Sequence, residues 1–435
     1  MKRILWFRRD LRVRDNKLLS YTGEVLPIFI FDKHILDKLE KDDKRVTLIY
    51  DYVFELKKEL QALGLDLKIF YDFPEDVFEK LLKEYDFDEV VASGDYDSYA
   101  KQRDLTISHK IHFRYLNETY LFKSKEILKK DGTPYLLFTP FYKVAMERLK
   151  SKDLTEVKIG SMQLLSYNYE DTPSLSDMGF VKQNITLPKA RQKLEDFKKK
   201  LADYKTQRDF PSLNGTSELS VSIRFGVLGI REIVRELFAI QGSYDFIREL
   251  IFREFYAYLL FHFPSLETQN FKYTFQGIKD SQKFEKFVNA KTGVPFIDAG
   301  VRELLTKGKM HNRVRMVVAS FFTKDLLLPW QMGEAFFAKY LLDYDKASNV
   351  LSWQWSAGTG VDPQPYFRVF NPYLQSKKFD KDVIYIKKYL PELQEIPSKY
   401  LHDEHYLLSN DIPNYPKPMV VHKEAAKRAI ELFKH

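Results

Sequence analysis

Near its start the chain reads Val25-Leu26-Pro27-Ile28-Phe29-Ile30-Phe31, a short apolar run that is typical of a β-strand. Further short runs predict strands at Ile4–Phe7, Leu67–Phe70 and Glu89–Ala92. Helical periodicity lies between them, at Val46–Leu63 and Glu75–Tyr85. Strands that alternate with helices in this way predict a parallel α/β sheet, and we expect it to form a domain over residues 1–125.

The periodicity weakens from about Lys123 to Tyr204, where stretches such as Thr172-Pro173-Ser174-Leu175-Ser176 indicate a long surface connection. We expect residues 126–204 to link two domains. Beyond Leu219 the strand-like runs disappear and helical patterns follow, so residues 205–435 are predicted to form a mainly α-helical domain. The expected helices are Ile230–Ile240, Tyr244–Phe263, Ile297–Thr306, Asn312–Leu328 and Gly333–Leu342.

Composition narrows the possible functions. The chain has 435 residues, a formal charge of +8 and no cysteine, which excludes disulfides, thiolate nucleophiles and cysteine-ligated clusters. The modest positive charge is compatible with a polyanionic partner. The apolar run Ile4–Phe7 is too short for a signal peptide, and no window is long and apolar enough to span a bilayer. We therefore expect a soluble, cytoplasmic protein.

Several well-known site motifs are incomplete in this sequence. Gly358-Thr359-Gly360 lacks the third glycine of a dinucleotide fingerprint because Pro363 occupies its place. Asp343-Tyr344-Asp345 begins like a calcium loop but lacks the glycine and the bidentate glutamate that such a loop requires. The histidine pairs His109/His112 and His402/His405 have no evident third ligand, so no metal site is expected.

The expected helix Tyr244–Phe263 carries a polar and aromatic face. Glu249, Phe252, Arg253 and Tyr256 follow helical spacing on this face, whereas a second set can face the core. The core set is Ile247, Leu250, Ile251 and Leu259. A carboxylate beside aromatic planes suits a planar ring with hydrogen-bonding groups, such as a base or a flavin. The alternative is a solvated Glu–Arg pair.

Two further segments combine polar groups with helix ends. Thr216 to Ser220 place hydroxyls and backbone amides before a helical stretch, which can hold phosphate, although a simple cap by Ser217 or Ser220 is the alternative. In Met310-His311-Asn312-Arg313-Val314-Arg315-Met316, the side chains of Asn312, Arg315, Met316 and Ala319 share one face, and Asn312 could serve only as a cap. A buried Arg315 needs a carboxylate, and Asp343 and Asp345 are the nearest in sequence.

Three of the four tryptophans cluster at Trp330, Trp353 and Trp355. They can be core residues, stacking platforms for bases or electron relays, and composition does not choose among these.

Taken together, these segments resemble the DNA photolyase/cryptochrome family, most closely its class I cyclobutane pyrimidine dimer photolyases. The similarity runs from Phe7-Arg8-Arg9-Asp10-Leu11-Arg12 to Tyr415-Pro416-Lys417-Pro418. Its other specific pieces are Gly215-Thr216-Ser217, Arg253-Glu254-Phe255-Tyr256, Lys291-Thr292-Gly293, Met310–Met316, Trp353-Gln354-Trp355 and Tyr366-Phe367-Arg368-Val369-Phe370-Asn371-Pro372. The resemblance implies an N-terminal Rossmann-like domain that can carry an antenna chromophore, a linker, and a C-terminal all-α domain that binds FAD.

The resemblance also implies roles for individual residues. Arg315 and Asp343 would pair beside the flavin ring, Asp345 would bond it, and Asn349 would face its N5, where plant-type cryptochromes have aspartate. The implied cofactor contacts are Tyr204, Thr216, Ser217, Glu218, Leu219, Ser220, Phe246, Arg253, Arg315, Asp343, Tyr344, Asp345 and Asn349. Trp353 and Trp330 match the inner two members of the family's electron-transfer chain.

For the substrate, the resemblance implies that Glu249 meets the edge of the pyrimidine dimer, that Asn312 and Met316 line its side, and that Trp355 forms a stacking wall. The implied DNA contacts are Arg208, Glu249, Phe252, Tyr256, Asn312, Arg313, Trp355, Arg368 and Gln375. Stacking combined with backbone cations is a common way to hold an extruded lesion. The implied reaction is light-driven: an electron from excited reduced FAD enters the dimer, two bonds break, and the electron returns.

Two departures from the family pattern stand out. Phe252 replaces a usual dimer-stacking tryptophan, so an aromatic wall of smaller area remains. The stretch Phe275 to Gly277 offers no outer tryptophan for the relay, which Tyr273 or another tyrosine would have to replace.

The main alternative is a cryptochrome-type blue-light photoreceptor without repair activity. The end of the chain at His435 leaves no long signalling tail, and Asn349 and Met316 also favour the enzyme. A light-independent, nucleic-acid-binding flavoprotein would not explain the retained tryptophans. The antenna site could hold a folate, a deazaflavin, a second flavin or nothing, and the expected partner is damaged DNA bound by a monomer.

Overall fold

The computed structural model describes residues 1–274 and 277–433, which divide into two compact units. The first unit comprises Met1–Tyr135, Thr139–Leu201 and Ser217–Pro264. The second comprises Leu136–Phe138, Ala202–Thr216 and Ser265–His435. Each unit collects segments that are distant in the chain, so the domain boundaries expected at residues 125 and 204 stay predictions.

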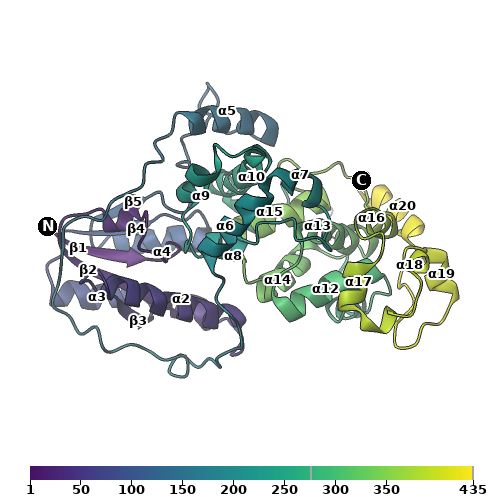
Figure 1. Cartoon of the computed structure of the whole chain (residues 1–435), viewed down its shortest axis with the longest axis horizontal. Coiled ribbons are helices and arrows are strands. Elements are labelled where there is room, and N and C mark those ends of the chain that lie inside the picture. Colours follow the sequence, from purple (N-terminus) through teal and green to yellow (C-terminus); the bar gives the residue numbers. More distant parts are fainter. Residues whose placement is uncertain (275–276, 434–435) are drawn as a thin grey trace. The chain divides into compact units, whose positions relative to one another are not determined.

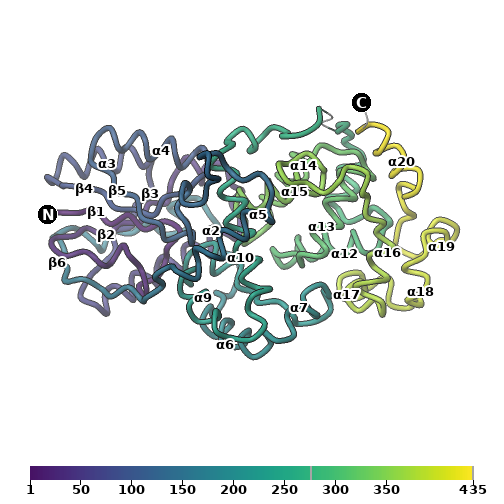
Figure 2. The backbone as a smooth tube through the Cα atoms, turned by 90° about the horizontal axis from the view of Figure 1, so that it is seen from above, coloured from purple at the N-terminus to yellow at the C-terminus, as the bar shows by residue number. Residues whose placement is uncertain are grey.

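A parallel sheet forms the centre of the first unit, as predicted. Its order is β3-β2-β1-β4-β5, and β6 pairs with the beginning of β2. Figure 2 traces the backbone of these strands in the part of the chain near the N-terminus. The strands are β1 (Lys2–Phe7), β2 (Gly23–Asp32), β3 (Lys68–Asp72), β4 (Glu89–Ser93), β5 (Phe113–Leu116) and β6 (Met162–Leu164). The four expected strands are present, whereas β5 and β6 were missed because they are short and carry exposed polar residues.

Both faces of this sheet are covered. Ile4 and Trp6 of β1 belong to a core cluster with Phe78 of the helix Pro74–Glu84 and Ile107 of the helix Ser98–Ser108. Neighbouring residues of a strand point to opposite faces, and Leu5 and Phe7 are fully buried as well. The continuous apolar runs in the sequence therefore reflect a sheet without a solvated face.

Helices flank the sheet, and the first unit contains further helices from later parts of the chain (Figure 1). They are α1 (Lys33–Leu36), α2 (Lys44–Gln61), α3 (Pro74–Glu84), α4 (Ser98–Ser108), α5 (Phe138–Lys150), α6 (Ala190–Lys200), α8 (Ser220–Arg224), α9 (Ile230–Leu237) and α10 (Ser243–His262). The long connection expected from Lys123 to Tyr204 contains α5, β6 and α6, so parts of it form regular structure. Polar surface positions weaken the periodicity of α6, where Leu194 and Phe197 nevertheless bury fully.

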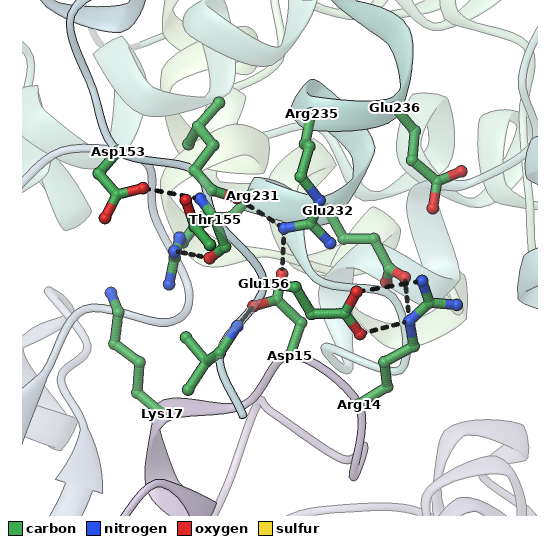
Figure 3. A network of polar contacts seen from close by, with 12 residues as sticks. Arg14, Asp15, Lys17, Asp153, Thr155, Glu156, Arg231, Glu232, Arg235 and Glu236 are labelled. Atoms are coloured by element: carbon green, nitrogen blue, oxygen red, sulfur yellow. Dashed lines mark hydrogen bonds and ion pairs between the residues drawn. The ribbon is translucent and has the colours of Figure 1, made fainter. Parts of the chain in front are cut away.

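A polar network fixes the irregular part of this connection (Figure 3). Asp15 is buried, with a left-handed φ of 50°, and its carboxylate accepts the Val157 amide at 2.8 Å and Arg235 at 2.8 Å. Arg231 donates to the Thr155 carbonyl at 2.9 Å. Because these partners satisfy backbone groups outside any helix or strand, the segment around 153–157 is held against α9 and the loop after β1.

The second unit is mainly helical, and no strand is assigned among its described residues. Its helices are α7 (Tyr204–Gln207), α11 (Ser281–Val288), α12 (Pro295–Lys307), α13 (Asn312–Ser320), α14 (Trp330–Tyr340), α15 (Lys346–Ala357), α16 (Pro372–Phe379), α17 (Ile384–Tyr389), α18 (Ser398–Leu401), α19 (Glu404–Ser409) and α20 (His422–Leu432). Short 3-10 turns of the chain lie at Lys17–Leu19, Leu201–Asp203, Pro264–Glu267 and Pro391–Leu393. Among residues 1–274 and 277–433, no helix has the length and apolar character needed to cross a bilayer.

One expected helix of this unit is shorter than predicted. Asn312–Leu328 was expected to be continuous, but α13 ends at Ser320 and a π-helical segment, Phe321–Asp325, follows. The Thr323 hydroxyl donates to the Ala319 carbonyl at 2.7 Å, and Lys324 and Asp325 are buried. A π-helical turn re-aims side chains, and here it directs two charged groups into the interior.

The Lys291-Thr292-Gly293 motif has a structural role. Asp298 of α12 is fully buried and accepts hydrogen bonds from the Thr292 amide and hydroxyl, the Gly293 amide and the Tyr415 hydroxyl, at 2.7 to 3.0 Å. At Gly293, φ is 77° and an added Cβ would lie 2.3 Å from the Lys417 backbone, so only glycine fits. Two motifs singled out in the sequence, Lys291–Gly293 and Tyr415–Pro418, thus meet at one carboxylate.

Candidate functional site

The polar and aromatic face predicted on α10 is present. Glu249, Phe252, Arg253 and Tyr256 are half-buried, whereas the four residues expected in the core are buried. The rings of Phe252 and Tyr256 lie 6.2 Å apart between centroids, and the Arg248 guanidinium lies 5.8 Å from the Phe252 ring. The helix therefore presents a carboxylate and two aromatic rings together.

Arg253 is fixed by the segment that follows β5. Its Nη1 donates to the Thr119 carbonyl at 2.9 Å, and the guanidinium lies 4.9 Å from the centre of the Tyr120 ring. Its Nη2 is buried without a hydrogen-bond partner. A buried, unsatisfied cationic donor is costly, so this atom is suited to an acceptor such as a phosphate oxygen.

Sequence reasoning missed the neighbouring Glu254. This carboxylate accepts the amides of Leu121 and Phe122 at 2.9 and 3.3 Å, and burial raises its pKa to about 7. It anchors the Thr119–Phe122 segment that orients Arg253. No local pattern distinguishes such a residue from its polar neighbours on the helix.

The segment Gly215–Ser220 forms a turn before α8. An added Cβ at Gly215 would lie 2.6 Å from Gln207, which explains the glycine. Neither Ser217 nor Ser220 caps α8, contrary to that alternative: Leu219 is the capping position, and the Ser217 hydroxyl accepts the Leu219 amide at 3.3 Å. Glu218 has a φ of 52° and pairs with Lys193 at 3.3 Å.

Phe246 and Tyr204, both expected cofactor contacts, are buried. Phe246 packs edge-on against Phe197, with centroids 4.7 Å apart. Tyr204 lies beneath the Arg208 guanidinium, 5.1 Å from it. Thr216 is half-buried.

The N-terminus of α13 presents the predicted Asn312–Met316 face. Asn312 is exposed, and its Nδ2 lies 3.9 Å from the Met316 sulfur. Asn312 is not the cap: His311 occupies that position, and its Nδ1 accepts the Arg313 amide at 3.2 Å. Burial lowers the pKa of His311 to about 4, so the ring is neutral at pH 7 and can accept this bond.

The predicted ion pair on α13 is confirmed. Arg315 Nη2 lies 3.1 and 3.0 Å from the two oxygens of Asp343, and its Nε donates to the Met310 carbonyl at 2.7 Å. Asp345 does not share this pair. Its carboxylate caps α15 by accepting the Ser348 amide at 3.0 Å.

Asn349 is held by a residue that the sequence did not single out. Its Nδ2 donates to the Glu334 carboxylate at 3.0 Å and to the Glu334 carbonyl at 3.1 Å. The Tyr344 hydroxyl bonds the same carboxylate at 3.2 Å, and burial raises the pKa of Glu334. The Asn349 amide nitrogen is thereby committed to Glu334, which orients the amide group.

The three clustered tryptophans have different surroundings. Trp353 is buried between Phe322 and Phe337, and an added Cβ at Gly333 would meet its ring at 2.2 Å. Trp330 is also buried and donates to Asn270 at 2.8 Å. Trp355 is half-buried, with its centroid 6.5 Å from that of Phe370.

The expected DNA contacts of the second unit differ in accessibility. Arg368 is exposed, and Gln375 is half-buried. Arg313 is less available than expected, because it pairs with Asp209 at 2.8 Å and lies 4.4 Å from the Phe379 ring. A phosphate that reaches Arg313 has to displace or share this carboxylate.

Each unit gathers its own set of expected site residues. The first unit brings together the α10 face, Arg253 and the turn that begins at Ser217. The second gathers α13 with its Arg315–Asp343 pair, Asn349 and the tryptophans. These donors and acceptors suit a flavin dinucleotide: the orphaned Arg253 Nη2 fits a phosphate, and the guanidinium, carboxylate and amide groups fit a ring with polar edges.

Two family models match the chain. The model described as "DNA photolyase" matches residues 3–158, and that described as "FAD binding domain of DNA photolyase" matches residues 246–435. A curated relative from Alkalihalophilus pseudofirmus, named deoxyribodipyrimidine photo-lyase, is 35% identical over 99% of this chain and 97% of its own length.

Two solved structures with similar folds are also named photolyases. A bacterial class III photolyase from Agrobacterium tumefaciens superposes with a TM-score of 0.87 at 30% identity, covering 100% of this chain and 97% of that one. An archaeal photolyase from Sulfolobus tokodaii with two FAD molecules also has a TM-score of 0.87, at 29% identity and with complete coverage of both chains.

Proposed function

The chain belongs to the DNA photolyase family, and from that premise we propose that it is a light-driven carbon–carbon lyase that splits cyclobutane pyrimidine dimers in DNA, with FAD as its cofactor. Two sets of side chains at α13 support this proposal most directly. Asn312 and Met316 form a face suited to the lesion, and Arg315 with Asp343 forms an ion pair suited to a flavin edge.

We assign the cofactor to the residues that the resemblance implies. Arg253, Tyr204 and the Thr216–Ser220 turn would hold the phosphates and the ribityl chain, and Arg315, Asp343, Asp345 and Asn349 would hold the ring. When bound and reduced, FAD supplies the light-excited electron donor. Because Glu334 fixes the Asn349 amide, the asparagine can meet a ring nitrogen without reorganising.

The lesion would meet the remaining side chains. Asn312, Met316 and Trp355 would line its sides, and Phe252 and Tyr256 would provide aromatic surface. Arg208, Arg313, Arg368 and Gln375 would contact the DNA backbone. This division between stacking and phosphate contacts suits a base pair that has left the helix.

We expect Glu249→Ala to lower the number of dimers repaired per absorbed photon severalfold. A carboxyl group at the edge of the dimer would stabilise charge that develops on the lesion, and the substitution removes it. The measurement is repair yield against absorbed light, with FAD content read from the absorption spectrum.

The matched control is Asp245→Ala, which removes an acid from the first turn of the same helix. This variant should repair as the wild type does, and both variants should retain FAD. An unchanged yield in Glu249→Ala would contradict the assigned role.

We further propose that Tyr273 is the outer member of the electron-transfer chain. Residues 275 and 276 of the stretch that lacks the outer tryptophan lie outside the described residues. Asn270 accepts the Trp330 indole N–H at 2.8 Å and donates to the Tyr273 carbonyl at 3.3 Å, and the Tyr273 side chain is exposed. These contacts support a path from Trp330 to solvent.

Tyr273→Phe should therefore slow the light-driven reduction of the bound flavin, and repair by chemically reduced enzyme should not change. Transient absorption after a blue flash measures this rate. Tyr366→Phe is the comparison, because the two rings lie only 5.8 Å apart. If Tyr366→Phe slows reduction and Tyr273→Phe does not, Tyr366 is the outer residue.

Three finer points belong to the same proposal. The protein acts as a monomer, and it works in the cytoplasm, associated with the nucleoid if its host is bacterial. A second chromophore in the parallel α/β part would serve as antenna, and the two FAD molecules of the Sulfolobus tokodaii structure make a flavin one candidate. A photoreceptor without repair remains the rival function, and a binding assay in darkness and under blue light separates the two.

A further inference from the structure

A fully buried lysine contacts the loop that carries Arg368. Lys324 belongs to the π-helical segment Phe321–Asp325, and its side chain is 0% exposed. Its Nζ donates to the carbonyls of Tyr366 and Arg368 at 3.1 and 3.0 Å. An ammonium group without solvent is costly, and two carbonyl dipoles offset part of that cost.

The residue that precedes this segment holds the chain just after the loop. The Ser320 hydroxyl, at the end of α13, accepts the Phe370 amide at 3.3 Å. Residues Phe367 and Arg368 are nevertheless exposed, so the loop is held through its backbone while these two side chains face solvent. This arrangement fixes where the Arg368 guanidinium can reach.

We propose that Lys324 is a positioning residue for DNA binding, which holds the Tyr366–Arg368 loop so that Arg368 meets a phosphate, and that DNA binding and the protonation of Lys324 are coupled. The inference rests on the function proposed above, in which Arg368 contacts the DNA backbone. It adds a buried residue that touches neither DNA nor cofactor.

The charges around Lys324 give the direction of the coupling. Burial, followed by the nearby Arg368, lowers the pKa of Lys324 to about 8, whereas Asp325 raises it. Asp325 is itself bonded to His422 of α20 at 2.6 Å and lies in the field of Glu404. Among the residues that the structure describes, these charged groups bear on the pair, together with the Tyr373 hydroxyl, which lies in the field of Asp325.

A phosphate bound to Arg368 would compensate the guanidinium charge and so raise the pKa of Lys324. The complex then holds the proton more tightly than the free protein does. By linkage, affinity for DNA is highest below pH 8 and falls as the pH rises above 8, where the free protein has lost this proton.

The test measures dissociation constants of the flavin-loaded protein for labelled DNA, with and without a thymine dimer, between pH 7 and 9.5. We expect the wild-type affinity to fall roughly three- to tenfold over this range, since one unit of pKa coupling is tenfold. Lys324→Met should bind more weakly at pH 7 and lose this pH dependence. Lys423→Met, which removes an exposed lysine of α20, should keep the wild-type profile.

A flat wild-type profile, or a Lys324→Met variant that keeps the wild-type affinity and profile, would overturn the proposal. If Lys324→Met does not fold, the Arg368→Met variant tests the proposal instead. In Arg368→Met, the fall in DNA affinity with rising pH should vanish or move to higher pH. An unchanged fall in Arg368→Met contradicts the coupling. The proposed function is tested separately, by whether the protein binds dimer-containing DNA more tightly than undamaged DNA at pH 7. The phosphate contact is tested on undamaged DNA as well.

Discussion

Replacing Trp353 with phenylalanine should nearly abolish the light-driven reduction of the bound flavin while sparing repair by enzyme that is reduced chemically beforehand. Trp353 is the inner buried indole, on α15, and Trp330 lies on α14, which packs against α15. An indole is far more easily oxidised than a phenyl ring, so phenylalanine interrupts the relay. The measurement is the rate of flavin bleaching under blue light with an external reductant.

The substitution also affects stability, and this effect has to be separated from the first. Trp353 packs against Phe322, Phe337 and Gly333, so a smaller ring leaves a cavity that costs roughly 1–3 kcal/mol. Trp6→Phe is the matched control, because Trp6 is equally buried in the core of the sheet. It should lose similar stability and keep flavin reduction; normal reduction in Trp353→Phe would exclude the proposed relay.

Replacing Asp298 with alanine should destabilise the second unit by about 3 kcal/mol or more, because four donors of Thr292, Gly293 and Tyr415 lose their acceptor in the interior. Tyr415→Phe removes one of these donors and should cost only about 1 kcal/mol. Denaturant unfolding of the flavin-loaded proteins measures both. Equal, small costs would show that the carboxylate does not organise this region.

The contribution of Asp298 to stability changes with pH in a defined direction. Burial raises the pKa of Asp298 to about 6, from 3.8 in an unfolded chain. The folded state therefore binds this proton more tightly, and the contribution to stability falls as the pH rises from about 4 to 6 and is then constant. Comparing wild type and Asp298→Asn between pH 4 and 7 isolates this contribution, because asparagine does not titrate.

The parallel sheet was predictable because its strands are buried on both faces, which leaves an apolar run such as Val25–Phe31 in the sequence. The need of Arg315 for a carboxylate was also predictable, since burying an unpaired guanidinium is costly. This argument left Asp343 and Asp345 as candidates, and the family resemblance pointed to Asp343, which the structure shows as the partner.

Other features depend on contacts between distant residues. The helix predicted to run from Asn312 to Leu328 ends at Ser320 because Lys324 and Asp325 find partners in the Tyr366–Arg368 loop and in His422. Glu334 lies in no quoted motif, and Glu254 lies in the Arg253–Tyr256 motif without an assigned role, so the roles of both follow only from the groups they bond. The roles of the individual site residues stay predictions until the variants are measured.

The central claim is that this chain repairs cyclobutane dimers with light. The most direct measurement mixes the purified, flavin-loaded protein with single- and double-stranded DNA that contains thymine dimers, illuminates it under reducing conditions, and quantifies restored thymines against a dark control. The account predicts restoration that depends on light and on bound flavin. Dimers that persist under light, although reduced flavin is bound, would contradict it.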